Sequence, residues 1–91
     1  MENGKLYAKI PYDATRATGR GPINLKEQLA VEEAISRPTG GEQIVTPDKM
    51  KDFRWLGTEG WEKRAQNING VEVHYNYNPK TVRIDDIKIK N

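Results

Sequence analysis

His74 is the only histidine of the chain, and it lies in a run where apolar and polar residues alternate strictly. One set comprises Val71, Val73, Tyr75 and Tyr77, and the other comprises Glu72, His74, Asn76 and Asn78. A period of two places successive side chains on opposite faces of a β-strand. The pattern therefore predicts a strand with one apolar face, and it places His74 on the polar face.

Residue types suited to cleaving RNA without a metal ion occur around His74. A base must take the 2′-hydroxyl proton, an acid must protonate the leaving oxygen, and cations must stabilise the charge at phosphorus. Histidine suits the first two tasks, and lysine or arginine suits the third. The candidates are His74 with Lys63 or Arg64, Lys80 and Arg83, and the rings of Trp61, Tyr75 and Tyr77 to stack bases. Composition alone favours the competing interpretation, an ordinary surface histidine on an exposed strand.

Two other functions remain open. Pro47-Asp48 and Asp86-Ile87-Lys88 imitate a metal-nuclease pattern, in which carboxylates hold Mg²⁺ and a lysine orients water. Pairing of Asp86 with a neighbouring cation is the structural alternative. A non-enzymatic module that binds nucleic acid or protein is the third hypothesis. The favoured ribonuclease hypothesis requires no metal and no cofactor.

Composition excludes several kinds of site. The chain has no cysteine, so disulfides, thiol catalysis and thiolate metal sites are absent. It has no glycine-rich phosphate loop, and its single serine, Ser36, falls at the end of a predicted helix. No apolar run approaches the ~20 residues of a membrane span, and residues 1–9 do not resemble a signal peptide. We therefore expect a soluble domain or a fragment delivered by a larger protein.

One helix is predicted over residues 25–36. Asn24 and Glu27 form a capping-box pattern, and Pro38 with Gly40-Gly41 ends the helix. The residues expected to face the core are Leu25, Leu29, Val31 and Ile35. Glu32 falls within the same arc, either at the margin of the core or in a polar cleft.

Three strands are predicted over residues 61–68, 71–77 and 82–89, forming an antiparallel meander. Asn69-Gly70 is a strong hairpin signal, and residues 78–81 form a second turn. A two-residue hairpin loop places Ala65 opposite His74 and Lys63 opposite Asn76. A slip of one residue instead places Gln66 opposite His74 and Arg64 opposite Asn76. At Asp85-Asp86 the apolar phase switches, which indicates a bulge or a change of buried face.

The remaining segments complete one α+β domain. Residues 1–20 are interpreted as a flexible arm or linker, in which residues 6–11 form either a short edge strand or an arm that ends at Pro11, and residues 21–91 as the compact part. Between 38 and 60 we expect a short strand near 43–46 and a turn of helix near 47–53. The expected apolar anchors there are Ile44, Val45, Phe53, Trp55 and Leu56.

Residues 21–30 (GPINLKEQLA), 60–64 (GWEKR), 69–75 (NGVEVHY) and 78–88 resemble a bacterial polymorphic toxin domain. The resemblance spans about residues 19–91. Such domains form the C-termini of contact-dependent growth-inhibition toxins and related secreted toxins, and they resemble the barnase, colicin and RelE-like ribonucleases. The resemblance implies secretion or cell-surface delivery within a larger toxin, and cleavage of tRNA or rRNA in a target bacterium's cytoplasm. It also implies a cognate immunity protein, with the domain a monomer or in a 1:1 heterodimer.

The resemblance also implies roles for individual residues. His74 and Lys63 are the first catalytic candidates, followed by Arg64, Thr81 and Arg83, with Thr81 bonding a phosphate oxygen. The further contributors are Arg20, Glu27 and Glu32. Val82 departs from the family pattern, because a glycine is expected after residues 78–81. A β-branched residue is poor at positive φ, which predicts that this turn differs locally.

Overall fold

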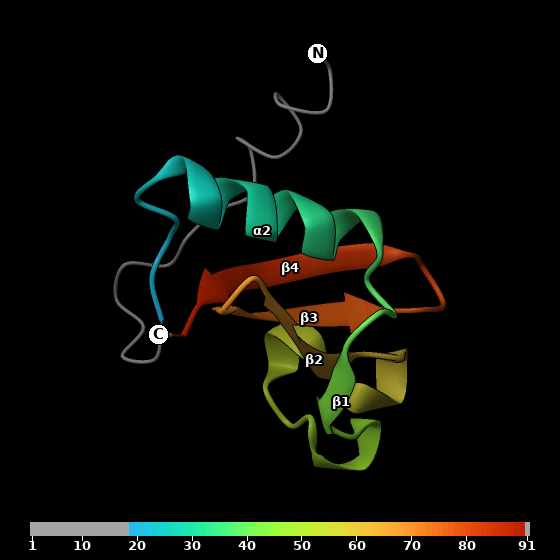
Figure 1. Ribbon diagram of the computed structural model, residues 1–91. Helices are drawn as coiled ribbons and strands as arrows, with labels where there is room; N and C mark the ends of the chain where they lie inside the picture. Colours follow the sequence, from blue (N-terminus) through green and yellow to red (C-terminus); the bar gives the residue numbers. More distant parts are fainter. Residues whose placement is uncertain (1–18, 91) are drawn as a thin grey trace.

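The computed structural model describes residues 19–90 and has one α-helix packed against a four-stranded antiparallel sheet, which confirms the α+β class (Figure 1). The helix is α2 (Leu25–Ser36), and the strands, in sheet order, are β1 (Glu42–Val45), β2 (Glu62–Ile68), β3 (Val71–Asn78) and β4 (Arg83–Ile89). Three 3-10 turns join β1 to β2: η1 (Pro47–Lys49), η2 (Phe53–Trp55) and η3 (Gly57–Glu59). The strand or arm expected near residues 6–11 lies outside the described residues.

The start of α2 is fixed by its own sequence. Asn24 Oδ1 accepts a hydrogen bond from the Glu27 backbone N–H at 2.9 Å, which satisfies one of the free donors of the first turn. The Glu27 carboxylate reaches the Ile23 N–H at 3.1 Å and also the Arg20 guanidinium. At the other end, Arg37 N–H bonds to the carbonyls of the last turn, just before Pro38 stops the helix.

The buried face of α2 differs from the predicted one. Ala30, Val31 and Ala34 are buried, whereas Leu25 and Leu29 are 68% and 54% exposed. Leu29 and Val31 lie about 200° apart around a helix, so one sheet cannot bury both. Burial follows the side with the two alanines, whose small side chains let the helix approach the sheet closely. The prediction that Leu25 and Leu29 face the core is therefore wrong.

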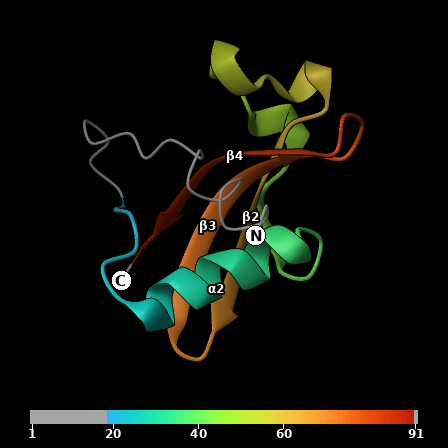
Figure 2. The ribbon, with the colours of Figure 1, turned by 90° about the horizontal axis from the view of Figure 1, so that it is seen from above.

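The apolar face of β3 lies under the helix, as its alternation predicted. Val71, Val73, Tyr75 and Tyr77 are all buried, together with Ile87 and Ile89 of β4. The Tyr75 hydroxyl donates to the Pro38 carbonyl and accepts from Gln66 Nε2, so its polar end is satisfied. Figure 2 shows α2 crossing the strands near the β2–β3 hairpin.

The β2–β3 hairpin adopts the two-residue loop, one of the two registers left open by the sequence. Ala65 lies opposite His74, and Lys63 lies opposite Asn76. Asn69 and Gly70 have φ values of 54° and 86°, the positive values that a tight primed turn requires.

The phase switch in β4 is a bulge. His74 pairs with Lys88 but Asn76 pairs with Asp85, and Asp86 has a φ of 53°. At the preceding turn Val82 also adopts a positive φ, 58°. The prediction that this turn differs because it lacks glycine is therefore wrong. The left-handed conformation costs a β-branched residue about 1–2 kcal/mol, and Val82 is too exposed for packing to offset this.

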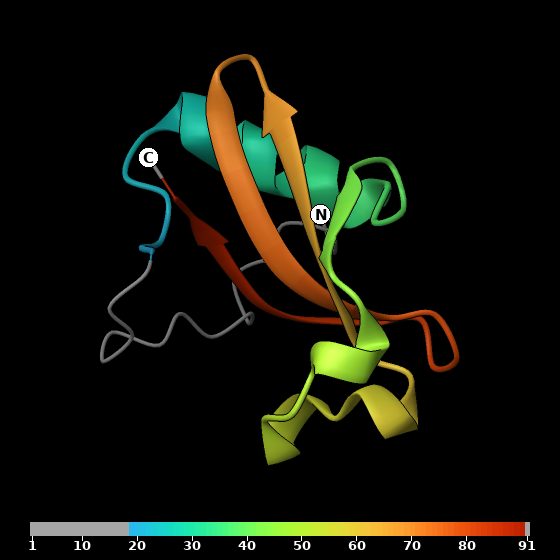
Figure 3. The same ribbon diagram turned by 90° about the horizontal axis from the view of Figure 1, so that it is seen from below.

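Residues 47–60 form a second, smaller cluster. Met50, Trp55 and Trp61 are buried together with Val45 beside them. Trp55 Nε1 donates to Asp85 Oδ2 at 2.9 Å, which fastens the segment to the sheet. Figures 2 and 3 show the segment at the end of the sheet opposite to the β2–β3 hairpin. Two expected anchors are not buried, because Phe53 is 83% exposed and Ile44 is 41% exposed.

Arg20 belongs to the folded body although it falls at the end of the predicted arm. Its backbone N–H donates to the Ile89 carbonyl at 3.0 Å, and Ile89 N–H donates back at 2.7 Å. This bridge adds to the free edge of β4. Among residues 19–90, no helix has the length and apolar character to cross a membrane.

Candidate functional site

The sheet face opposite α2 carries the polar side chains of β3. Antiparallel partners share a face, so the register assigns one set of residues to it. We call this set the polar face: Glu72, His74 and Asn76 of β3, Lys63, Ala65 and Asn67 of β2, and Asp85 and Lys88 of β4.

His74 and Glu72 form the central contact of the polar face. His74 Nε2 lies 3.1 Å from Glu72 Oε2, and the two side chains are 17% and 36% exposed. A carboxylate only accepts hydrogen bonds, so the proton of this contact belongs to Nε2. The neutral imidazole then presents Nδ1 as a base. Glu72 was not among the sequence candidates, although its spacing of two from His74 on one strand could have identified it.

Asn67 connects this pair to the hairpin turn. Its Nδ2 donates to Glu72 Oε1 at 3.1 Å, and its Oδ1 accepts from the Gly70 backbone N–H at 3.1 Å. Asn67 lies directly opposite Glu72 in the register. The turn therefore holds Asn67, Asn67 holds Glu72, and Glu72 holds the imidazole. Sequence reasoning missed Asn67 because its role depends on the register.

The electrostatic surroundings favour the neutral imidazole. Burial lowers the pKa of His74 below its usual 6.5, and the ammonium groups of Lys90 and Lys63 act in the same direction. Hydrogen bonding to Glu72 opposes them without reversing the shift. At pH 7 His74 is therefore mostly neutral and able to accept a proton.

Lysines supply the positive charge near His74. Lys63 and Lys90 are close enough to lower the pKa of its imidazole. Lys88 lies directly opposite His74, but its Nζ is 3.0 Å from Asp86 Oδ2, and both side chains are almost fully buried. Asp86 and Lys88, the pair expected for a metal nuclease, thus bind each other.

Arg64 points away from His74. Since Ala65 lies opposite His74, Arg64 falls on the face that α2 covers. Its guanidinium bonds to Glu62 Oε2 at 2.6 Å and to the Gly41 carbonyl at 3.0 Å. It ties the segment before β1 to the sheet. Lys63 and Arg64 were the two cations expected near His74. The register places Lys63 on the same face as His74 and Arg64 on the opposite face.

The three aromatic rings proposed to stack bases lie in the interior. Tyr75 and Tyr77 are 0% and 6% exposed beneath α2, and Trp61 is 7% exposed in the cluster with Met50 and Trp55. Burial raises the pKa of the Tyr75 hydroxyl. These rings present no free face to a substrate and stabilise the two cores instead.

Lys80, Thr81 and Arg83 lie at the β3–β4 turn and are exposed. Arg83 pairs with Asn78, four residues along β3 from His74, which corresponds to about 13 Å. Trp55 binds Asp85, which lies opposite Asn76, between His74 and Asn78 along β3. The structure therefore does not bring the turn residues to His74.

Arg20, Glu27 and Glu32 belong to the other side of the sheet. The Arg20 guanidinium bonds both carboxylate oxygens of Glu27, at 2.6 and 2.7 Å. This contact, together with the Ile23 N–H, lowers the pKa of Glu27 to about 2. Glu32 is partly buried on α2. None of the three lies on the polar face with His74.

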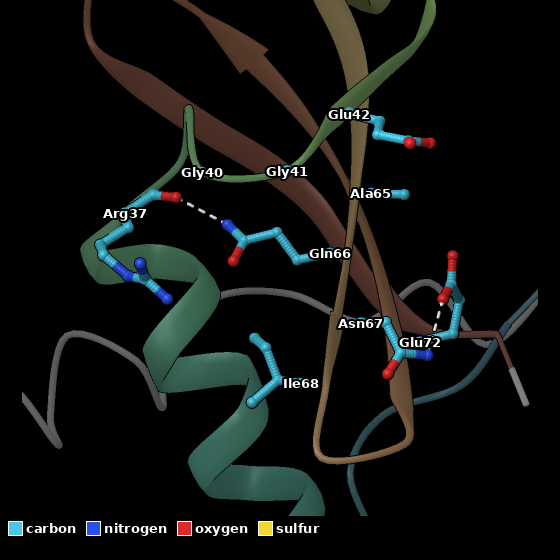
Figure 4. A pocket seen from close by; sticks show the side chains of 9 residues that line it. All are labelled: Arg37, Gly40, Gly41, Glu42, Ala65, Gln66, Asn67, Ile68 and Glu72. Atoms are coloured by element: carbon cyan, nitrogen blue, oxygen red, sulfur yellow. Dashed lines mark hydrogen bonds between the residues drawn. The ribbon is translucent and has the colours of Figure 1, made fainter.

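A hollow of about 480 Å³ adjoins Glu72 at the edge of β2. Figure 4 shows Asn67 and Glu72 together on one side of β2, with Gln66 and Ile68 on the side facing the helix. Gly41 passes so close to β2 that a Cβ there would lie 1.9 Å from the Ala65 carbonyl oxygen. The hollow adjoins the Glu72–His74 pair through Glu72, and His74 does not line it.

Comparison with known proteins returns no match, whether with family models, curated proteins or solved structures. Within residues 19–90, no three histidine, aspartate or glutamate side chains gather in a way that could hold a metal ion.

Proposed function

We propose that this chain is an antibacterial toxin nuclease domain, a metal-independent ribonuclease that cleaves tRNA or rRNA. The observation that carries the proposal is the Glu72–His74 pair, held by Asn67 and accompanied by the ammonium groups of Lys63 and Lys90. The resemblance of residues 19–91 to polymorphic toxin domains supports the same function. The four-stranded antiparallel sheet with a preceding helix agrees with the ribonuclease-like arrangement implied by that resemblance.

The proposed reaction is transfer of the phosphodiester to the neighbouring 2′-oxygen. Nδ1 of neutral His74 takes the 2′-hydroxyl proton, and the oxygen attacks phosphorus. Glu72 stabilises the imidazolium that forms and keeps the ring oriented. Lys63 and Lys90 stabilise the charge of the phosphorane-like transition state. Water at the open side of the site protonates the leaving 5′-oxygen. The products are a 2′,3′-cyclic phosphate and a 5′-hydroxyl.

The biological setting follows from the resemblance. The domain is delivered from the surface or by secretion as part of a larger toxin, and it acts in the cytoplasm of the target bacterium. A cognate immunity protein binds it 1:1 and protects the producer. A small acidic protein encoded directly downstream would support this setting.

Cleavage of bacterial RNA in EDTA tests the proposal. Total RNA incubated with the protein should yield fragments ending in 2′,3′-cyclic phosphate. His74→Ala should reduce the rate by at least ~100-fold, because a general base contributes 10²–10⁴. Glu72→Gln should show a smaller loss. Glu59→Gln, an exposed change on η3, is the matched control and should leave the rate unchanged. Intact RNA at high protein concentration would refute the ribonuclease.

The same experiment separates the other two hypotheses. A metal-dependent nuclease that uses Asp86 and Lys88 would cleave only with Mg²⁺ and would lose activity in Asp86→Asn while retaining it in His74→Ala. A non-enzymatic binding module would leave RNA intact both in EDTA and with Mg²⁺. Its expression in the cytoplasm would not slow growth.

A further inference from the structure

Phe53 is the most exposed large apolar side chain of the described residues, with 83% of its surface accessible. Exposed apolar residues are common on proteins, but a phenylalanine this free of contacts is unusual in a segment that is otherwise anchored. It lies in η2, between Asp52 and the buried Trp55. We call residues 49–54 the Phe53 loop.

The Phe53 loop is held rigidly although its tip is exposed. Asp52 Oδ1 accepts from the Arg54 backbone N–H at 3.0 Å, and Trp55 N–H donates to the Asp52 carbonyl at 2.8 Å. The Arg54 guanidinium lies 4.3 Å from the centroid of the Trp55 ring. The Trp55 indole is itself bonded to Asp85. The backbone that carries Phe53 is therefore held in place, so that binding orders the phenyl ring but little of the backbone.

Positive charge flanks the ring. Lys49 and Lys51 are exposed, and neither ammonium has an ion-pair partner among residues 19–90. The Asp52 carboxylate is bound to Arg54 at 2.8 Å, which neutralises it. An open hollow of about 550 Å³ surrounds the tip and is lined by Lys51, Asp52, Phe53 and Arg54. An exposed aromatic face beside free cations matches the chemistry of an unpaired nucleotide, a flat base attached to a phosphate.

The Phe53 loop belongs to the same side of the molecule as the Glu72–His74 pair. Its anchor, Trp55, binds Asp85, which lies opposite Asn76. Asn76 is two residues from His74 along β3, about 7 Å. Asn76 is only 1% exposed, so a strand of RNA that reaches from His74 to the Phe53 loop would pass over the contact between Trp55 and Asp85 rather than along the sheet itself.

We propose that the Phe53 loop is a base-stacking site for an unpaired nucleotide of the substrate, with Lys51 contacting a flanking phosphate. The inference rests on the proposed ribonuclease function and narrows the substrate class to RNA with unpaired bases. In a duplex the bases are stacked on one another and offer no free face to Phe53.

Binding measured in the inactive His74→Ala protein tests this site. The probe is a fluorescein-labelled single-stranded RNA of mixed sequence, and the same sequence as a duplex is the comparison. Adding Phe53→Ala should weaken single-strand binding about 5- to 150-fold, because one stacked base contributes about 1–3 kcal/mol. Phe53→Trp should retain the affinity. Lys51→Ala should reduce the dependence of the affinity on salt.

Leu25→Ala is the matched control, since Leu25 is a comparably exposed apolar residue at 68%. It should change neither binding nor thermal unfolding, and Phe53→Ala should unfold at the same temperature as the parent. If the parent protein cleaves RNA but Phe53→Ala leaves the affinity for single-stranded RNA unchanged, the stacking site is overturned and the ribonuclease function stands. Loss of immunity-protein capture in Phe53→Ala, with RNA binding intact, would overturn it in favour of a protein anchor. RNA neither bound nor cleaved would overturn both proposals.

Discussion

The general-base role proposed for His74 depends on three contacts in different parts of the hairpin. The turn residue Gly70 bonds to Asn67, Asn67 bonds to Glu72, and Glu72 bonds to the imidazole. Each link is an ordinary hydrogen bond, with a net value of about 1 kcal/mol. Together they fix which nitrogen of His74 carries the proton, which is the property a general base requires.

Asn67→Asp tests whether this chain of contacts matters for catalysis. The aspartate keeps the oxygen that accepts from Gly70 but loses the donor to Glu72 and places a second carboxylate beside it. The added negative charge should hold the proton on His74 to a higher pH. The lowered pKa of His74 predicts a midpoint of the pH–rate profile below pH 6.5 in the parent, and we expect Asn67→Asp to move this midpoint upward.

Asn69→Asp is the control for the Asn67 variant. It adds the same charge two residues further along the chain, in the turn itself, at a position with positive φ that aspartate tolerates. A shift confined to Asn67→Asp supports the contact with Glu72. Equal shifts in the two variants would show that only the charge matters.

At the scale of elements, α2 is attached to the sheet by small side chains. Val31 and Ala34 are fully buried, while Leu29 remains 54% exposed. The free energy of unfolding should therefore depend on Val31 far more than on the larger Leu29. Val31→Ala should destabilise the protein by about 2 kcal/mol, because it removes buried methyl groups and leaves a cavity.

Leu29→Ala is the matched substitution on the exposed side of the same helix. It should change stability by less than ~0.5 kcal/mol. Urea unfolding followed by tryptophan fluorescence measures both variants. A larger effect at Leu29 than at Val31 would mean that the helix packs through the face predicted from the sequence.

At the scale of the whole molecule, the contact between Arg20 and Glu27 links the start of α2 to the edge of the sheet. Arg20 pairs with the edge of β4 through its backbone and with α2 through its guanidinium. It therefore joins the last strand to the start of the helix. The pKa of Glu27 is lowered from 4.5 to about 2 in the folded protein, so the contact contributes to stability only while Glu27 is ionised.

This shift predicts how stability depends on pH. The unfolded chain binds a proton at Glu27 as the pH falls below 4.5, whereas the folded protein resists protonation until about pH 2. The contribution of Glu27 is thus complete above pH 4.5 and is lost between pH 4.5 and 2. Glu27→Gln should be less stable than the parent at pH 6, and the difference should shrink through this window. The exposed Glu42→Gln is the control, and an equal pH response in both variants would contradict the prediction.

The sequence by itself determined the features that depend on local patterns. Alternation in residues 71–77 defined the two faces of β3, and Asn24 with Glu27 marked the start of the helix. Asn69-Gly70 marked the hairpin. These predictions succeed because backbone geometry at each place is fixed by residues within a few positions of one another.

Only the tertiary structure decided which side chains meet. The register placed Lys63 with His74 and sent Arg64 to the opposite face. Packing buried Tyr75, Tyr77 and Trp61, which the sequence assigned to the substrate, and left Phe53 exposed. The register of β4 placed Arg83 opposite Asn78, four residues along β3 from His74. These outcomes depend on contacts between residues far apart in the chain, where one step of register or a rotation of the helix exchanges buried and exposed side chains.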